Sequence, residues 1–139
     1  MKKLQLFTLL LVILCACSKE DDTATVLNGS WKLERIEDGF IENSPNDEEI
    51  TISFENDVYT GRTEANEFGG DYTVARDSLF LSNSYTTEVT ETEWGQKFYE
   101  SLRMAFDERE ERSKFRMVIE GSILTLRNGS KNLIFEATD

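Results

Sequence analysis

Few residues of this 139-residue chain could take part in covalent or metal chemistry. It contains no histidine, and its two cysteines, Cys15 and Cys17, both lie near the amino terminus. Without histidine there are no Ser-His or Cys-His pairs to activate a nucleophile, and no imidazole ligands for zinc. The 27 Asp and Glu residues include an acidic run at residues 47–49, but this run lacks the spaced ligands of a calcium loop. We therefore expect no catalytic residue, no metal, no cofactor and no enzymatic activity.

The cysteines follow a segment that is typical of an export signal. Two lysines precede the mostly apolar run Leu4 to Leu14, which is shorter than the roughly 20 apolar residues that span a bilayer. A basic start and a short apolar run indicate a secretory signal peptide. The sequence Leu14-Cys15-Ala16-Cys17 resembles the lipobox of bacterial lipoproteins, which implies cleavage before Cys17 and attachment of lipid to its sulfur. The alternative is an ordinary signal peptide with two incidental cysteines.

The resemblance divides the amino terminus into two parts. Residues 1–16 are predicted to be a lipoprotein signal peptide, and residues 17–26 a lipidated, flexible acidic tether, because such a polar composition cannot bury enough apolar surface to fold. Two or three acyl chains on Cys17 would anchor the protein stably, at about 0.8 kcal/mol per buried methylene. The acidic residues after Cys17 resemble a tag for display on the outer surface. We expect an outer-membrane lipoprotein, with cell-surface exposure as the further expectation.

Size and charge limit the partners of the remaining chain. Removal of residues 1–16 leaves 123 residues, enough for one domain with a hydrophobic core. The removed segment holds two of the 15 basic residues and none of the acidic ones, so the net charge changes from −12 to about −14. Because nucleic-acid affinity depends mainly on cations that neutralise phosphates, we expect no nucleic-acid partner.

Hydrophobic periodicity predicts one domain, residues 27–139, made of short strands and one helix. Apolar and polar residues alternate in the strand segments, and residues 38–48 are predicted to form a polar loop. The predicted strands contain Trp31–Leu33, Ile50–Phe54, Val58–Gly61, Tyr72–Val74, Leu79–Leu81, Phe115–Ile119, Ile123–Leu126 and Leu133–Phe135.

The helix is predicted over about Glu91 to Glu111. Thr90 and Glu93 have the spacing of a capping box. Apolar residues recur every fourth position, which predicts one buried stripe; its members are Trp94, Phe98, Leu102 and Phe106. The predicted class is α+β: a curved antiparallel sheet or partly open barrel of about eight strands, packed around one amphipathic helix.

Two stretches of this sequence are similar to a known family. The segment Gly61 to Val74, G-R-T-E-A-N-E-F-G-G-D-Y-T-V, resembles the central motif of META (HslJ-like) domains, and Gly29-x-Trp31-x-Leu33 resembles the opening strand that META domains share with lipocalin-like lipoproteins. Cysteines common in the META family are replaced by Ala65 and, near the second position, Glu91. The residues that match the motif are Gly61, Asn66, Phe68, Gly70 and Tyr72.

The motif residues also have a structural interpretation. Asn66 is predicted to occupy a turn in a left-handed backbone conformation, and the glycines are predicted to let strands approach closely. The resemblance implies a small envelope domain linked to stress tolerance, without enzymatic activity. The leading hypothesis is therefore a lipid-anchored, non-enzymatic protein that binds another envelope component, such as an envelope protein.

Two other hypotheses stay open. The Gly29-x-Trp31 opening and the strand count also suit a lipocalin-like barrel that carries a small apolar ligand. The helix discriminates between the hypotheses: if Trp94, Phe98 and Phe106 fill the concave side of the sheet, no cavity for a ligand remains. An enzyme that uses carboxylates is the third hypothesis; it would require an acid-rich cleft with a strongly raised carboxyl pKa.

Overall fold

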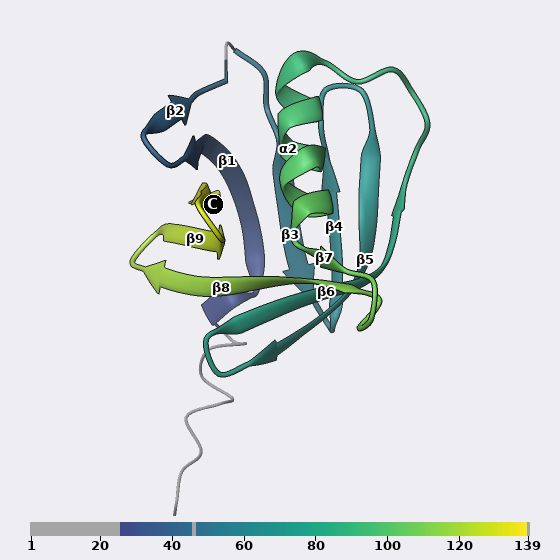
Figure 1. The fold of residues 1–139 in the computed structure, drawn as a ribbon, viewed down its shortest axis with the longest axis vertical. Coiled ribbons are helices and arrows are strands. Elements are labelled where there is room, and N and C mark those ends of the chain that lie inside the picture. Colours follow the sequence, from purple (N-terminus) through teal and green to yellow (C-terminus); the bar gives the residue numbers. More distant parts are fainter. Residues whose placement is uncertain (1–25, 46, 139) are drawn as a thin grey trace, which may run out of the picture.

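The computed structural model describes residues 26–45 and 47–138, whose strands pair in a ring (Figure 1). The strand order β1-β3-β4-β5-β6-β8-β9-β10 returns to β1 through β10, so eight antiparallel strands close into a barrel with one long helix, α2. The predicted α+β fold class is thereby confirmed. The elements are β1 (Gly29–Asp38), β2 (Ile41–Asn43), β3 (Thr51–Glu55), β4 (Val58–Arg62), β5 (Glu67–Ala75), β6 (Ser78–Thr86), α2 (Glu93–Met104), β7 (Phe106–Asp107), β8 (Arg112–Glu120), β9 (Ile123–Asn128) and β10 (Lys131–Thr138).

The barrel closes along a long seam between its first and last strands. β1 and β10 are paired antiparallel from Ser30 opposite Thr138 to Asp38 opposite Lys131, with one bulge between Leu33 and Arg35. A bulge inserts one extra residue into a strand, so the side chains after it change faces of the sheet. Trp31, Leu33 and Ile36 can therefore all be buried although their spacing changes from two to three.

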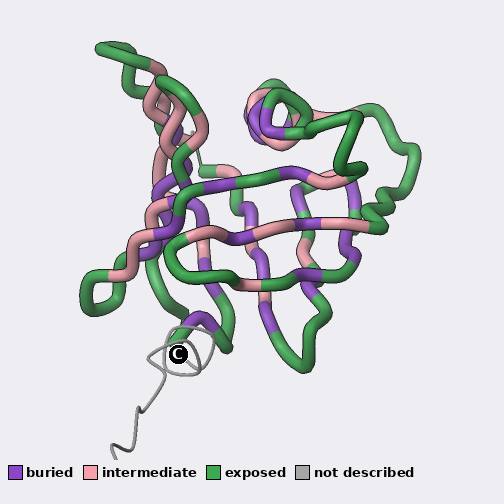
Figure 2. The backbone as a smooth tube through the Cα atoms, turned by 60° about the horizontal axis from the view of Figure 1, so that its bottom comes forward, coloured by how far each residue is buried: buried purple, intermediate pink, exposed green. Residues whose placement is uncertain are grey.

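Alternating burial along the strands produces a single core (Figure 2). In β3 and β9 every second side chain is buried, as the alternation in the sequence predicts. Both helix residues Trp94 and Phe98 join the same cluster of buried side chains. The side chains with no exposed surface at all are Leu27, Leu33, Phe54, Leu79, Phe98, Leu124 and Phe135. Every strand of the barrel and all of this cluster lie within residues 26–138, so this segment contains a complete hydrophobic core.

The tight turns occur where the strand pattern requires them. Asn56 and Asp57 both have positive φ, 51° and 64°. A two-residue hairpin loop of type I′ requires positive φ at both of its residues. Gly121 and Gly129 adopt φ of 61° and 57° between the last three strands, a conformation that glycine adopts without steric cost.

The helix is shorter than the predicted Glu91 to Glu111: it begins at Glu93 and ends at Met104. The Thr92 Oγ1 atom, rather than Thr90, accepts the capping hydrogen bond, from the amide of Gly95 at 3.1 Å. At the other end Ala105 is the last cap residue. The chain then enters β7, which pairs with the start of β8.

Two further differences follow from short strands. Phe106 does not continue the helix stripe; it lies in β7 and is 48 % exposed. The predicted polar loop 38–48 contains β2, which pairs with the end of β1. Three-residue and two-residue strands have too few positions for an alternating pattern to reveal them.

The predicted signal peptide, the tether up to residue 25 and Cys17 lie outside the described residues. Among the residues that are described, no helix has the length and apolar character needed to cross a bilayer.

Candidate functional site: a pocket between β6 and α2

The sheet stops pairing on one side of β6 halfway along that strand. β6 pairs with β5 as far as Thr86, but it pairs with β8 only from Ser78 to Ser82. The remaining segment, Asn83–Thr86, has no strand on that side among the described residues, and its side chains are exposed. An unpaired strand edge presents backbone N–H and C=O groups to whatever lies beside it.

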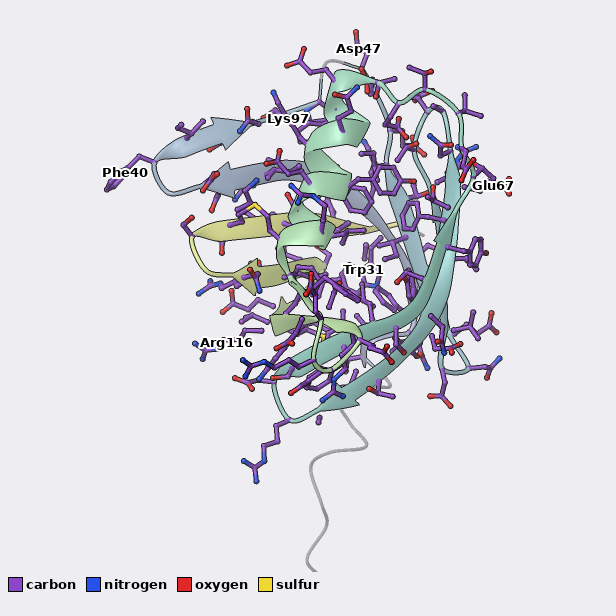
Figure 3. All side chains as sticks on the ribbon, turned by 45° about the vertical axis from the view of Figure 1, so that its right-hand side comes forward. Trp31, Phe40, Asp47, Glu67, Lys97 and Arg116 are labelled. Atoms are coloured by element: carbon purple, nitrogen blue, oxygen red, sulfur yellow. The ribbon has the colours of Figure 1, made fainter. Side chains whose placement is uncertain are left out.

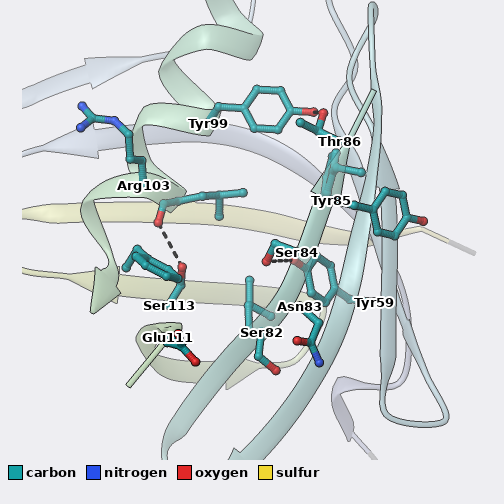
Figure 4. A pocket seen from close by; sticks show the side chains of 14 residues that line it. Tyr59, Ser82, Asn83, Ser84, Tyr85, Thr86, Tyr99, Arg103, Glu111 and Ser113 are labelled. Carbon is teal, nitrogen blue, oxygen red and sulfur yellow. Dashed lines mark hydrogen bonds between the residues drawn. The ribbon is translucent and has the colours of Figure 1, made fainter. Parts of the chain in front are cut away.

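A cavity of about 590 Å³, partly open to solvent, lies beside this edge, and we call it the β6–α2 pocket (Figure 4). Its volume falls within the roughly 300–1,000 Å³ of small-molecule sites. The apolar and aromatic lining residues are Tyr59, Phe68, Leu81, Tyr85, Tyr99, Leu102 and Phe106, and the polar ones are Ser82, Asn83, Ser84, Thr86, Arg103, Glu111 and Ser113.

Core residues form the deep wall of the pocket, and a glycine leaves room for one of them. Tyr59, Phe68 and Leu81 are each less than 4 % exposed. A Cβ atom on Gly70 would lie 2.9 Å from Cε1 of Tyr59, closer than packed side chains tolerate. Only glycine therefore lets the Tyr59 ring lie against β5. Phe68 in turn packs on the Phe98 ring, with 5.2 Å between ring centroids.

The helix forms the opposite wall without filling the pocket. Trp94 and Phe98 are buried in the barrel core, whereas Tyr99 and Leu102 are half-buried and line the pocket beside them. Phe106, at 48 % exposed, lies at the mouth. The stripe is thus divided between core and pocket, and the cavity that a small ligand needs is present.

Tyrosine hydroxyls supply hydrogen-bonding groups to both walls. The Tyr59 hydroxyl lies 2.6 Å from Oγ of Ser84, and the Tyr99 hydroxyl lies 3.1 Å from Oγ1 of Thr86. Burial raises the pKa of both phenols above the ordinary value of 10.0. Both tyrosines are therefore neutral at physiological pH, and these walls are uncharged.

The charged groups of the pocket lie at its rim. Both are exposed: Arg103, in the last turn of α2, directs its guanidinium away from the hydroxyl-lined interior, whereas Glu111 lies below Ser113 (Figure 4). Neither residue forms an ion pair within 4.0 Å in the described part of the chain. Glu111 has a φ of 52°, which is unusual for a residue other than Asn, Asp or Gly.

Asn66 lies outside the pocket and joins two connections of the chain. It is 5 % exposed, and its amide nitrogen donates to the Val89 carbonyl at 2.9 Å and to Oε2 of Glu91 at 2.7 Å. Its Oδ1 atom accepts from the Thr87 hydroxyl at 2.9 Å and from the Val89 amide at 2.8 Å. The predicted left-handed backbone at Asn66 is wrong, since its φ is not positive. Its amide instead holds the β6–α2 connection against the β4–β5 turn.

The other motif residues are spread over the barrel. Phe68 lines the pocket, and Gly70 makes room for Tyr59. A side chain on Gly61 would collide with the Phe68 ring and the Thr51 carbonyl. Tyr72 lies apart from the pocket; its hydroxyl donates to Oδ1 of Asn28 at 2.9 Å. The motif therefore contributes one lining residue and the close approaches behind it.

Most of the pocket could not be found from a motif. Tyr59 and Tyr99 belong to segments that read as ordinary core strand and helix. One signal was present: Ser82-Asn83-Ser84-Tyr85-Thr86 lacks the apolar alternation of the first half of β6. Such a loss of alternation indicates a strand that no longer packs on the core.

In the part of the chain that the structure describes, no metal centre competes with the pocket as a candidate site. Within residues 26–45 and 47–138, no group of three or more Asp, Glu, His or Cys side chains is arranged to hold an ion.

Comparison with protein families gives an extensive match. The model of a family described as a lipocalin-like domain matches residues 12–137. No curated protein sequence matches the chain significantly.

Solved structures share the fold at low sequence identity. A lipocalin-like protein from Bacteroides uniformis is 14% identical with a TM-score of 0.56, over 81% of this chain and 98% of that one. An uncharacterized protein from Bacteroides eggerthii is 12% identical with a TM-score of 0.54, over 81% and 99%. A protein from Burkholderia xenovorans is 16% identical with a TM-score of 0.65, over 84% and 87%. At these identities the similarity concerns the fold.

Proposed function

The chain belongs to the lipocalin-like domain family, and from this premise we propose that it binds a small, largely apolar molecule in the β6–α2 pocket. Eight-stranded barrels of the lipocalin type typically enclose one small ligand. The observation that carries the proposal is the cavity of about 590 Å³ between β6 and α2, with aromatic walls and neutral hydroxyls. A few polar groups on apolar walls are the usual composition of a small-molecule site.

The proposal can be tested with the domain itself. A protein of residues 26–139, which holds every barrel strand, is incubated with an envelope lipid extract and weighed by native mass spectrometry. We expect an added mass of small-molecule size. Ser84→Trp places a bulky ring where the Ser84 hydroxyl meets Tyr59, so it should abolish the added mass.

Thr73→Trp is the matched control, since Thr73 is exposed on β5 and does not line the pocket. A bare wild-type domain would contradict the proposal. Equal retention of the added mass by Ser84→Trp would move the site elsewhere.

We also propose that the domain is held at the outer membrane by lipid on Cys17, with cell-surface display as an extension. The support is the basic start, the short apolar run and the lipobox-like Leu14-Cys15-Ala16-Cys17. Metabolic labelling with an alkyne fatty acid should mark the wild type and Cys15→Ser, but not Cys17→Ser. Labelling that survives Cys17→Ser would contradict the anchor.

A second candidate function is the binding of another envelope component, as the META-type resemblance implies. One observation favours it: the β1–β2 tip projects Phe40 and Ile41, which are fully and 65 % exposed (Figure 3). A photo-cross-linker at position 40 should then capture one envelope protein, in normal growth or under stress, whereas the same group at exposed Arg109 should not. Identical capture at both positions would count against this function.

A further inference from the structure

We propose that the β6–α2 pocket selects cationic ligands: small molecules with a flat apolar body and one protonated amine. This inference rests on the proposed small-molecule function and specifies its ligand class. It combines three features of the pocket, namely its aromatic faces, its hydrogen-bond acceptors and the charges around its mouth.

Aromatic rings surround the cavity from both sides. Tyr59 and Phe68 form the deep wall, Tyr99 stands on the helix, and Phe106 lies at the mouth. The negative face of such rings attracts an ammonium group within about 6 Å, with more effect where water is excluded. The same rings provide apolar contact for the body of the ligand.

The hydroxyl groups and the strand edge suit a ligand that donates hydrogen bonds. An ammonium group has three donors and no acceptor. The Ser84 and Thr86 hydroxyl oxygens can accept, and alternate carbonyls of an unpaired strand edge point outward and also accept. No described strand covers Asn83–Thr86 on this side, and all four residues line the cavity.

The electrostatics around the mouth favour a positive ligand. Glu111, an exposed lining residue, has no ionic partner among the described residues, while the Arg103 guanidinium points away from the interior (Figure 4). The whole chain carries a net charge of −12. A strongly acidic protein concentrates cations near its surface and repels anions.

Three ligands that share a naphthalene ring test the inference: 1-naphthylmethylamine, which is a cation at neutral pH, neutral 1-naphthalenemethanol, and anionic 1-naphthoic acid. Calorimetric titration of residues 26–139 should give an affinity order of amine, alcohol, acid. We expect the amine to bind about tenfold more tightly than the acid at low salt. This preference should shrink to about threefold at about 0.5 M salt, where surface charges are screened.

Two pocket variants and one control variant locate the preference in the pocket. Glu111→Gln should weaken the amine about threefold to fivefold, the effect of one nearby unit charge in water, and should change the affinity for the alcohol less than that for the amine. Glu108→Gln removes an equal charge from a neighbouring exposed residue outside the pocket lining and should change amine affinity less than twofold, because water and salt weaken its interaction. Phe106→Leu keeps an apolar side chain but removes the ring, so it should reduce the amine more than the alcohol.

Each outcome decides between the two proposals. If alcohol, amine and acid bind equally, or the acid binds best, the cation preference is overturned while small-molecule binding stands. If the amine binds Ser84→Trp as tightly as the wild type, the preference does not belong to this pocket. If no naphthalene probe binds at all, both the ligand class and the proposed function are overturned.

Discussion

The β1–β10 seam and the free end of β6 are parts of one sheet with opposite properties. At the seam, Phe135 of β10 pairs with Leu33 on one side and Leu124 on the other, and none of the three has any exposed surface. At the free end, Tyr85 and Thr86 pair only with β5, Asn83 and Ser84 lie in an irregularity of that pairing, and all four residues are exposed. The seam strands are paired on both sides and bury a row of apolar side chains, whereas the free end is paired on one side at most and its residues are exposed.

The difference shows how one barrel can provide both stability and a binding site. The hydrogen bonds and buried apolar surface of the seam stabilise the fold. Where β8 stops pairing with β6, the sheet leaves a cavity that the helix only partly covers. The chain stabilises the edge of this cavity with individual contacts, such as the Tyr99–Thr86 hydrogen bond of 3.1 Å, instead of another strand.

The largest expected effect separates the two regions by stability. Phe135→Ala removes a fully buried ring from the seam and should lower the free energy of unfolding by about 3–5 kcal/mol. Phe106→Ala, at the pocket, should cost less than about 1 kcal/mol because this residue is already 48 % exposed. Urea denaturation of both variants measures the difference. Equal losses would break the comparison.

The next effect concerns the connection between the regions. Asn66→Ala leaves the Val89 carbonyl and amide without their side-chain partner and removes one of the hydrogen bonds to the Glu91 carboxylate, so it should cost about 2–3 kcal/mol. Asn128→Ala is the control, because its exposed amide makes one hydrogen bond, to the Lys114 carbonyl. A loss for Asn66→Ala no larger than that for Asn128→Ala would show that the β6–α2 connection does not depend on this amide.

A smaller effect is a difference in pH dependence. Burial raises the pKa of Tyr59 at the pocket above 10.0, so the folded state holds this proton more tightly than the unfolded state. That contribution is complete below pH 10 and is lost as the pH rises through the folded pKa. At the seam, hydrogen bonds from Asn132 and Arg35 lower the pKa of Glu37 below 4.5. Its contribution is present above the unfolded pKa and is lost as the pH falls through the folded one.

Denaturation curves across pH therefore test both regions in one experiment. Tyr59→Phe should flatten the alkaline decline of stability and leave the acid limb unchanged. Asn132→Ala should flatten the acid limb and leave the alkaline decline unchanged. If the alkaline decline of stability persists in full in Tyr59→Phe, groups other than Tyr59 cause it.

The sequence predicted the repetitive parts of the fold and little of the site. Alternation located β3, β4, β8 and β9, since a strand with one buried face carries a period of two. The helix ends seven residues before the predicted Glu111. Phe106 has the spacing of the helical stripe, so the pattern extended the prediction, but in the structure Phe106 lies in β7 and pairs with Ser113. Closure through β1 and β10 joins residues about 100 positions apart, which no local pattern encodes.

The pocket could not be predicted from the sequence for a related reason. Tyr59 and Tyr99 come from a strand and a helix that are distant in sequence, and their rings meet the same cavity only after the barrel closes. The Tyr59 ring is buried against Gly70 only because β4 pairs with β5. Residue type alone cannot tell such tyrosines from ordinary core residues.

The central claim is that the free end of β6 and the helix form the ligand site while the seam does not. NMR titration of ¹⁵N-labelled residues 26–139 with the dye N-phenyl-1-naphthylamine tests it most directly. We predict that the shifted amide signals cluster in Ser82–Thr86, Tyr99–Phe106 and Glu111–Ser113, and that Leu33 and Phe135 stay unchanged. Shifts concentrated along β1 and β10, or no shifts at all, would contradict the account.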